Sequence, residues 1–185
     1  MRMYGWVGGA LALCLPLAAE TVTITLLATT DVHGNIMPYD YFTAKPAARG
    51  LASLAPVISA VRRENPNTLL IDCGDTIQGS PLEAVFQQYR RSGSLPLGLK
   101  FDGEPLRTDP MMLVMNHLRY DAMVLGNHEF NFGLKNLNAA RSEARFPWLS
   151  ANTTASDGAK PFEPYIVRTM GGVKVAVVGL TTSAI

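Results

Sequence analysis

The sequence is poor in several features that mark particular classes of protein. It contains 2 cysteines in 185 residues, too few for a disulfide framework. Basic and acidic side chains nearly balance, at 16 and 15, and the net charge is +1. Proteins that bind nucleic-acid polymers usually carry a basic patch, so we expect no such partner. With 48% apolar and 17% charged residues, the chain is neither disordered nor a coiled coil.

The one long apolar stretch lies at the N-terminus. Arg2 is followed by a nearly uncharged run from Gly5 to Ala19 that ends in two alanines. A basic start, a short apolar run and small residues are typical of a secretory signal peptide. The run is shorter than the roughly 20 residues of a membrane-spanning helix. We therefore predict a signal peptide over residues 1–19, a periplasmic or secreted protein, and no stable membrane anchor after cleavage. An uncleaved N-terminal anchor is the alternative.

Residues 20–185 alternate between strand patterns and helix patterns. Apolar or β-branched runs predict strands at 22–28, 68–73, 121–125, 148–151, 165–169 and 173–178. Apolar residues at helical spacing predict helices at 49–64, 81–89, 110–118 and 132–144. Ser80 is expected to cap the second helix, and Gly171-Gly172 to form a hairpin turn. This alternation, without internal repeats, indicates one α/β domain.

Polar side chains follow three of these strands directly. Asp31 and His33 come after the first strand, Asp75 after the second, and Asn127 and His128 after the third. In open α/β sheets ligands bind beyond the carboxyl ends of the strands, so these residues should converge despite sequence gaps of about fifty residues. Glycines beside each group allow the backbone to approach a ligand closely.

The residue types in these groups suit divalent cations. A carboxylate beside an imidazole, as in Asp31 and His33, is a ligand set for Zn, Mn or Fe. Asp75 has two oxygens and can bridge two cations, while Asn127 offers a neutral amide oxygen. Two metals roughly 3.5–4 Å apart can clamp a phosphate and stabilise in-line attack. The pattern therefore favours a two-metal phosphoesterase site.

Each group alone also has an ordinary structural explanation. Asp31 could cap a turn, Gly74-Asp75 could be a common strand-end turn, and Asn127-His128 could lie in a loop with satisfied polar groups. Only their combination, in this order behind three strands, favours the metal site. His117 has no such neighbours and is predicted to be a solvated or hydrogen-bonded helix residue.

Asp31-Val32-His33, Gly74-Asp75 and Gly126-Asn127-His128-Glu129 resemble the first three motifs of the calcineurin-like metallophosphoesterase superfamily. The longer segments 72–82 and 126–134 are similar to its 5′-nucleotidase branch, nearest to the periplasmic 2′,3′-cyclic-nucleotide 2′-phosphodiesterase/3′-nucleotidases. The resemblance runs from about Val22 to the end of the chain. It implies part of a four-layer α-β-β-α sandwich, truncated at the C-terminus, and a small nucleotide as substrate.

The resemblance also implies a role for each matched residue. Asp31 and His33 would hold a first divalent metal (Mn, Zn or similar), Asp75 would bridge, and Asn127 would bind a second. His128 would stabilise the transition state or protonate the leaving oxygen. Many 5′-nucleotidases carry an aspartate three residues later that orients this histidine. Here the residue is Asn131, which favours cyclic-nucleotide substrates.

The chain departs from the family pattern in its histidines. The family completes its site with histidines downstream of the strand that ends near Gly179, and this chain contains only His33, His117 and His128. The resemblance thus implies the N-terminal part of a larger enzyme, with a C-terminal segment needed for a complete site. A 5′-nucleotidase or sulfur-ester hydrolase is one alternative, and an inactive remnant or a metal- or nucleotide-binding module is another.

Overall fold

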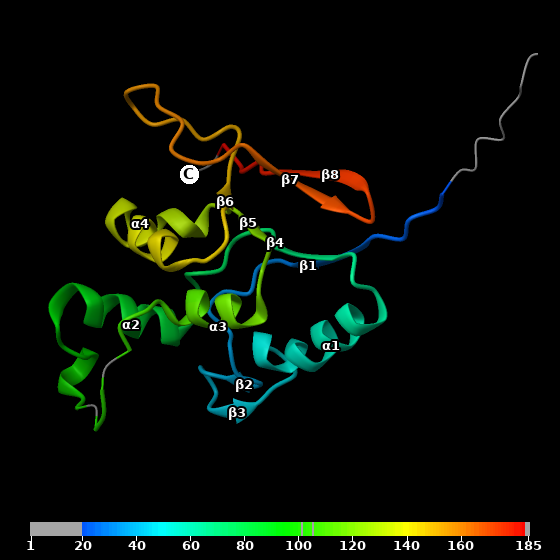
Figure 1. The fold of residues 1–185 in the computed structure, drawn as a ribbon. Coiled ribbons are helices and arrows are strands. Elements are labelled where there is room, and N and C mark those ends of the chain that lie inside the picture. Colours follow the sequence, from blue (N-terminus) through cyan, green and yellow to red (C-terminus); the bar gives the residue numbers. More distant parts are fainter. Residues whose placement is uncertain (1–19, 101, 105, 184–185) are drawn as a thin grey trace, which may run out of the picture.

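A four-stranded parallel sheet forms the centre of the molecule (Figure 1). The computed structural model describes residues 20–183 except 101 and 105, so the predicted signal peptide lies outside the described residues. The strand order is β1-β4-β5-β6. These strands are β1 (Thr25–Thr29), β4 (Thr68–Asp72), β5 (Ala122–Val124) and β6 (Trp148–Leu149). The parallel sheet confirms the predicted α/β class.

Helices cover one face of this sheet. The α-helices of the described residues are α1 (Leu51–Glu64), α2 (Pro81–Ser92), α3 (Pro110–Leu118) and α4 (Leu134–Glu143). The main core packs side chains of α1, α3 and α4 against Leu70, Met123 and Trp148 of the strands. Burying one such side chain contributes roughly 1.5–3 kcal/mol, so this face supplies most of the apolar stabilisation. His117 of α3 is exposed, as the sequence predicted.

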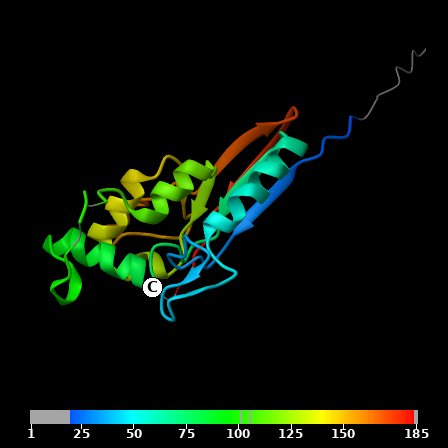
Figure 2. The same cartoon turned by 90° about the horizontal axis from the view of Figure 1, so that it is seen from below.

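A β-hairpin covers part of the other face. It consists of β7 (Tyr165–Met170) and β8 (Val173–Val178), paired antiparallel. Gly171 and Gly172 both have positive φ, at 53° and 81°, which is the backbone of the predicted two-residue turn. Ile166 of the hairpin packs against Ile71 and Leu149 of the sheet. Figure 2 shows the hairpin running along the sheet. The described residues thus form α, β and β layers, and the outer side of the hairpin is exposed at Tyr165 and Val167.

Several short elements have no counterpart in the predicted set. They are β2 (Tyr39–Asp40) and β3 (Lys45–Pro46), which form a small hairpin, and the 3-10 turns η1 (Pro96–Gly98) and η2 (His128–Phe130). Elements of two or three residues are too short to show a periodic pattern, so the sequence did not reveal them. Within residues 20–183, as far as they are described, no helix combines the length and the apolar character needed to cross a membrane.

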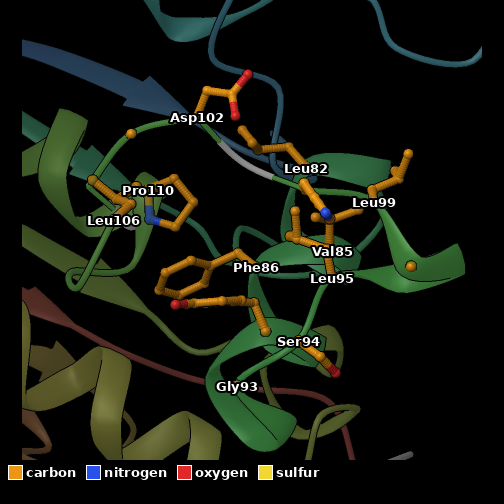
Figure 3. A pocket seen from close by; sticks show the side chains of 14 residues that line it. Leu82, Val85, Phe86, Gly93, Ser94, Leu95, Leu99, Asp102, Leu106 and Pro110 are labelled. Carbon is orange, nitrogen blue, oxygen red and sulfur yellow. The ribbon is translucent and has the colours of Figure 1, made fainter.

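Helix α2 and the segment after it line an open apolar pocket of about 720 Å³ (Figure 3). Leu82, Val85 and Phe86 line it from the helix, and Leu95 and Leu99 line it from the following segment. None of its lining residues belongs to the three loops that carry the predicted metal ligands. The pocket is therefore a feature separate from the site described below.

A buried polar network joins α2 to α3. Asp109 caps α3, since one carboxylate oxygen accepts hydrogen bonds from the Met111 and Met112 amides, at 3.0 and 3.2 Å. Its other oxygen accepts from Gln87 Nε2 at 3.0 Å, and Gln87 also faces Glu83 at 3.5 Å. Burial raises the pKa of Asp109 to about 6, and burial together with the nearby Asp109 charge raises the pKa of Glu83 well above its usual value.

Asp109→Asn is expected to flatten the dependence of stability on pH. Between the ordinary Asp pKa of 3.8 and the folded-state value of about 6, the folded chain holds a proton that the unfolded chain releases. The free energy of unfolding therefore falls as pH rises through this window. Asparagine keeps the capping oxygen but cannot ionise. Gln87 Oε1 lacks a hydrogen-bond partner, and after rotation of the Gln87 amide group it can accept from the NH₂ group of the new asparagine. Urea unfolding at pH 4 to 7, with a chelator present, measures how the free energy of unfolding changes with pH in the unsubstituted chain and in Asp109→Asn. Equal slopes for the two proteins would contradict the prediction.

Candidate metal centre

The loops that follow β1, β4 and β5 meet at one end of the sheet, as the sequence predicted. Backbone hydrogen bonds join the first two loops. The amides of Asp31, His33 and Gly34 donate to the carbonyls of Gly74, Asp75 and Thr76, at 3.1, 2.9 and 2.8 Å. The third loop joins them through the His128 amide, which donates to Asp75 Oδ1 at 2.9 Å. The convergence therefore depends largely on main-chain contacts.

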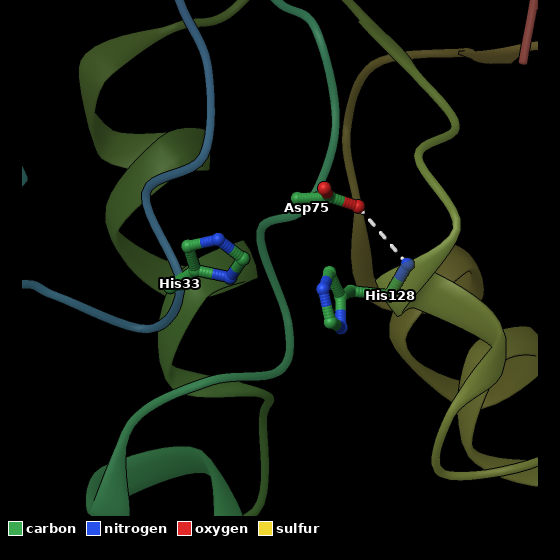
Figure 4. A group of neighbouring side chains, drawn as sticks. All are labelled: His33, Asp75 and His128. Carbon is green, nitrogen blue, oxygen red and sulfur yellow. Dashed lines mark hydrogen bonds between the residues drawn. The ribbon is translucent and has the colours of Figure 1, made fainter. Parts of the chain in front are cut away.

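Three side chains from these loops form a cluster with metal-ligand chemistry (Figure 4). His33, Asp75 and His128 each offer one ligand atom, and these atoms lie within 4.8 Å of one another. The two imidazole rings meet edge to face, with centroids 5.1 Å apart. All three residues are half-buried, so a cation and a small substrate can reach them. Two ring nitrogens and one carboxylate fit Mn or Zn.

Unusual backbone conformations direct these side chains. Asp31, His33 and Asp75 have φ values of 53°, 50° and 59°, in the left-handed region. Each such residue costs of order 1–3 kcal/mol and persists only where its surroundings impose it. The loops also pack backbone against backbone, because a Cβ on Gly74 would lie 2.3 Å from the Gly126 nitrogen. The strain and the close approach occur together at the predicted site.

The other two predicted ligands lie beside this cluster. Asp31 is exposed, and its Oδ1 lies 3.7 Å from His33 Nε2. Asn127 immediately precedes His128 and is half-buried, and its carbonyl accepts the Phe130 amide to form the turn η2. Their roles as metal ligands stay predictions, as do those of His33 and Asp75.

Hydrogen bonds fix the orientation of both histidine rings. His33 Nδ1 lies 2.8 Å from the Gln78 carbonyl, which can only accept, so Nδ1 donates and Nε2 is left as a lone-pair donor for a cation. Asn131 Nδ2 lies 2.8 Å from His128 Nδ1 and 3.4 Å from Gln78 Oε1. An amide nitrogen can only donate, so the proton of a neutral His128 ring sits on Nε2. Gln78 thus contacts the His33 ring directly and the His128 ring through Asn131.

Sequence reasoning missed three residues that support the site. Gln78 is one. Asp72 is fully buried and accepts from the Thr29 and Thr76 hydroxyls, both at 2.5 Å, and burial raises its pKa to about 6. Glu129 is also fully buried and accepts backbone amides of two loops. For the two acidic residues the available signal was their position, because Asp72 ends an apolar strand and Glu129 directly follows Asn127-His128.

The chain is similar to known proteins in both sequence and fold. Residues 24–178 match a family model described as Calcineurin-like phosphoesterase. Over 151 residues the chain is 42% identical to the Trifunctional nucleotide phosphoesterase protein YfkN of Bacillus subtilis, covering 81% of this chain and 10% of that protein. It is 38% identical over 151 residues to a 2′,3′-cyclic-nucleotide 2′-phosphodiesterase/3′-nucleotidase of Yersinia enterocolitica, covering 80% of this chain and 21% of that protein.

The fold comparison agrees. The crystal structure of calcineurin-like phosphoesterase YfkN from Bacillus subtilis matches with a TM-score of 0.70 and 39% identity, covering 85% of this chain and 48% of that one. The chain therefore spans about half of this structure, and a tenth to a fifth of the two curated relatives.

Proposed function

Because this chain belongs to the calcineurin-like phosphoesterase family, we propose that it carries part of a two-metal site that hydrolyses phosphoesters of small nucleotides. The observation that carries the proposal is the cluster of His33, Asp75 and His128 at the carboxyl ends of three strands. The proposed substrates are 2′,3′-cyclic nucleotides and 3′-nucleotides. The proposed location is the periplasm or the exterior of the cell, on the pattern of residues 1–19.

We assign the proposed ligands as the sequence predicted them. Asp31 and His33 would hold one divalent cation, Asp75 would lie between the two, and Asn127 would hold the other. The donor set fits, since His33 Nε2 is left free by the hydrogen bond of Nδ1 to Gln78. When bound, the cations supply positive charge that stabilises the phosphate in the transition state.

His128 is the proposed hydrogen-bond donor to the transition state. Its Nε2 carries the proton when Asn131 donates to Nδ1, so Nε2 can donate a hydrogen bond that stabilises the charge developing on the leaving oxygen of the substrate. An aspartate at position 131 would accept a hydrogen bond from Nδ1, whereas Asn131 donates one to it. The asparagine at this position is the feature that favours cyclic nucleotides over 5′-monophosphates, as the sequence predicted.

Metal dependence tests this proposal directly. When the chain is titrated with Mn²⁺ in a calorimeter, we expect it to bind the cation. The His117→Ala variant should bind Mn²⁺ equally well, because the His117 side chain is exposed on α3. For hydrolysis, the chain is joined to the remaining phosphoesterase segment of the Bacillus subtilis protein. We expect hydrolysis of 2′,3′-cyclic AMP that stops when a chelator removes the metal.

The same assays separate the alternatives. Faster release of phosphate from 5′-AMP than from the cyclic substrate would identify a 5′-nucleotidase. Mn²⁺ binding without hydrolysis of either substrate would identify a binding module, and no Mn²⁺ binding at all would refute the metal site and leave an inactive remnant.

A further inference from the structure

We propose that Glu129 is a positioning residue that fixes the geometry of the metal site from beneath. Its carboxylate binds backbone amides of two different loops and so sets Asp75 at a defined place relative to His128. The inference rests on the proposed function, because it concerns the same site. Glu129 itself is fully buried and is not among the proposed metal ligands.

The contacts of Glu129 involve both of its carboxylate oxygens. Oε2 accepts from the Asp75 amide at 2.9 Å and from the Gly126 amide at 2.7 Å. Oε1 accepts from the Thr76 amide at 2.6 Å and from the Ile77 amide at 3.3 Å. Four main-chain donors, three after β4 and one after β5, therefore converge on one side chain. This side chain cross-links the two loops.

The environment of this carboxylate is unusual. Its exposed fraction is 0%, and no ion pair among the described residues involves it. A buried charge needs compensation, and here the compensation comes from backbone amides. Consecutive amides that point to one anion form a concave anion site, in which a left-handed residue alternates with ordinary ones. Glu129 occupies such a site in the β4 loop.

The strained residue of that loop is Asp75. Its φ of 59° is unfavourable for a residue with a side chain, and the amides of Asp75, Thr76 and Ile77 point to Glu129 in this conformation. Hydrogen bonds to a charged acceptor are stronger than those between neutral groups, and three of them act on this strained segment. Glu129 therefore stabilises the backbone that presents the Asp75 carboxylate to the site.

The two neighbours in the turn η2 have different surroundings. Glu129 is buried against the loops, while the half-buried His128 ring lies in the cluster with His33 (Figure 4). The His128 amide donates to Asp75 Oδ1 at 2.9 Å, so the turn that holds Glu129 also holds the carboxylate it positions. A shift of Glu129 would move Asp75 and His128 relative to one another.

Close substitutes of Glu129 cannot reproduce this arrangement. In Glu129→Gln one oxygen becomes an NH₂ group, which would face backbone donors without accepting from them. In Glu129→Asp the side chain is one methylene shorter and cannot reach both loops at the same distances. Glu129→Gln keeps the size of the side chain and Glu129→Asp keeps its charge. The two variants therefore test where the carboxylate oxygens lie rather than how much space the side chain fills.

The experiment measures Mn²⁺ binding to the described chain by calorimetry and by the electron paramagnetic resonance spectrum of the bound ion. Glu129→Gln is expected to weaken Mn²⁺ binding by about 10–100-fold, the usual effect of removing a group that orients metal ligands. It should also change the spectrum. The matched control is Glu143→Gln, because Glu143 likewise accepts a backbone amide, that of Asp109 at 2.7 Å, and pairs with Arg90 outside the three loops.

Glu143→Gln should lower stability yet leave Mn²⁺ affinity and the spectrum unchanged. Unchanged Mn²⁺ affinity in a folded Glu129→Gln would overturn the inference, whereas failure of the unsubstituted chain to bind Mn²⁺ would refute the proposed function itself. If Glu129→Gln does not fold, two other measurements still test the inference. Glu129→Asp, which keeps the charge, should bind Mn²⁺ more weakly than the unsubstituted chain but should still bind it. In the unsubstituted chain the amides of residues 75–77 and 126 should exchange hydrogen slowly, and fast exchange would overturn the inference.

Discussion

Replacing His128 by alanine is expected to lower kcat for hydrolysis of 2′,3′-cyclic AMP by roughly 10²–10³-fold, the usual loss when a hydrogen-bond donor to the transition state is removed. The reason is the tautomer imposed by Asn131, which leaves the proton on His128 Nε2. The measurement uses the chain joined to the remaining phosphoesterase segment, with saturating Mn²⁺. His117→Ala is the control, because that histidine is exposed on α3 and should not affect kcat.

Two further measurements distinguish a hydrogen-bond donor from a metal ligand. A hydrogen bond to the leaving oxygen matters most when that oxygen is strongly basic, so the loss in His128→Ala should shrink for a p-nitrophenyl ester, whose leaving group is a weak base. Mn²⁺ affinity should stay close to that of the unsubstituted chain. A parallel loss of Mn²⁺ affinity would instead make His128 a ligand, a role that would require Asn131 to release Nδ1. Unchanged hydrolysis would refute both roles.

The largest loss of stability is expected for Gly74→Ala. Gly74 has φ of 94°, and an added Cβ would lie 2.3 Å from the Gly126 nitrogen and 2.8 Å from the Val124 oxygen. Both atoms are backbone and cannot rotate away. The strain of a left-handed alanine costs roughly 1–2 kcal/mol and the overpacking typically another 1–3 kcal/mol, so we expect a total of about 2–5 kcal/mol.

Urea unfolding of the metal-free chain measures this loss, and Gly93→Ala is the matched control. Gly93 is also left-handed, with φ of 68°, but a Cβ there would meet nothing within 4 Å. Gly93→Ala should therefore cost only the conformational part, about 1–2 kcal/mol. If both variants lose the same free energy of unfolding, the two loops do not approach one another as closely as the structure shows.

Much of the fold could be predicted from residue patterns. The run from Thr68 to Asp72 is apolar on both faces, and the structure buries every residue of it, as expected for a central parallel strand. The hairpin at Gly171-Gly172 and the convergence of the three loops were also predicted correctly. These features have signals that are either periodic or local.

Other features could not be predicted because their partners are distant backbone atoms. Ser80 was expected to cap α2 with its side chain, but it makes no such bond and its hydroxyl donates to the Gly34 carbonyl at 3.1 Å. Glu129 likewise accepts from main-chain amides of another loop, and the main-chain carbonyl of Gln78 accepts from the His33 ring. The left-handed φ of Asp75 depends on those contacts too. No pattern in the chain specifies which amide a side chain will meet.

The main-chain hydrogen bonds between the loops after β1 and β4 have a consequence for how a cation would be captured. Their donors and acceptors are peptide groups, so the loops are aligned without using the carboxylate or imidazole atoms that would bind metal. The entropy lost in ordering these loops belongs to folding, and little is left to be lost on binding. Such a site is preorganised. Its side chains can diverge in evolution, changing the preferred ion or substrate, while the frame that holds them keeps its shape.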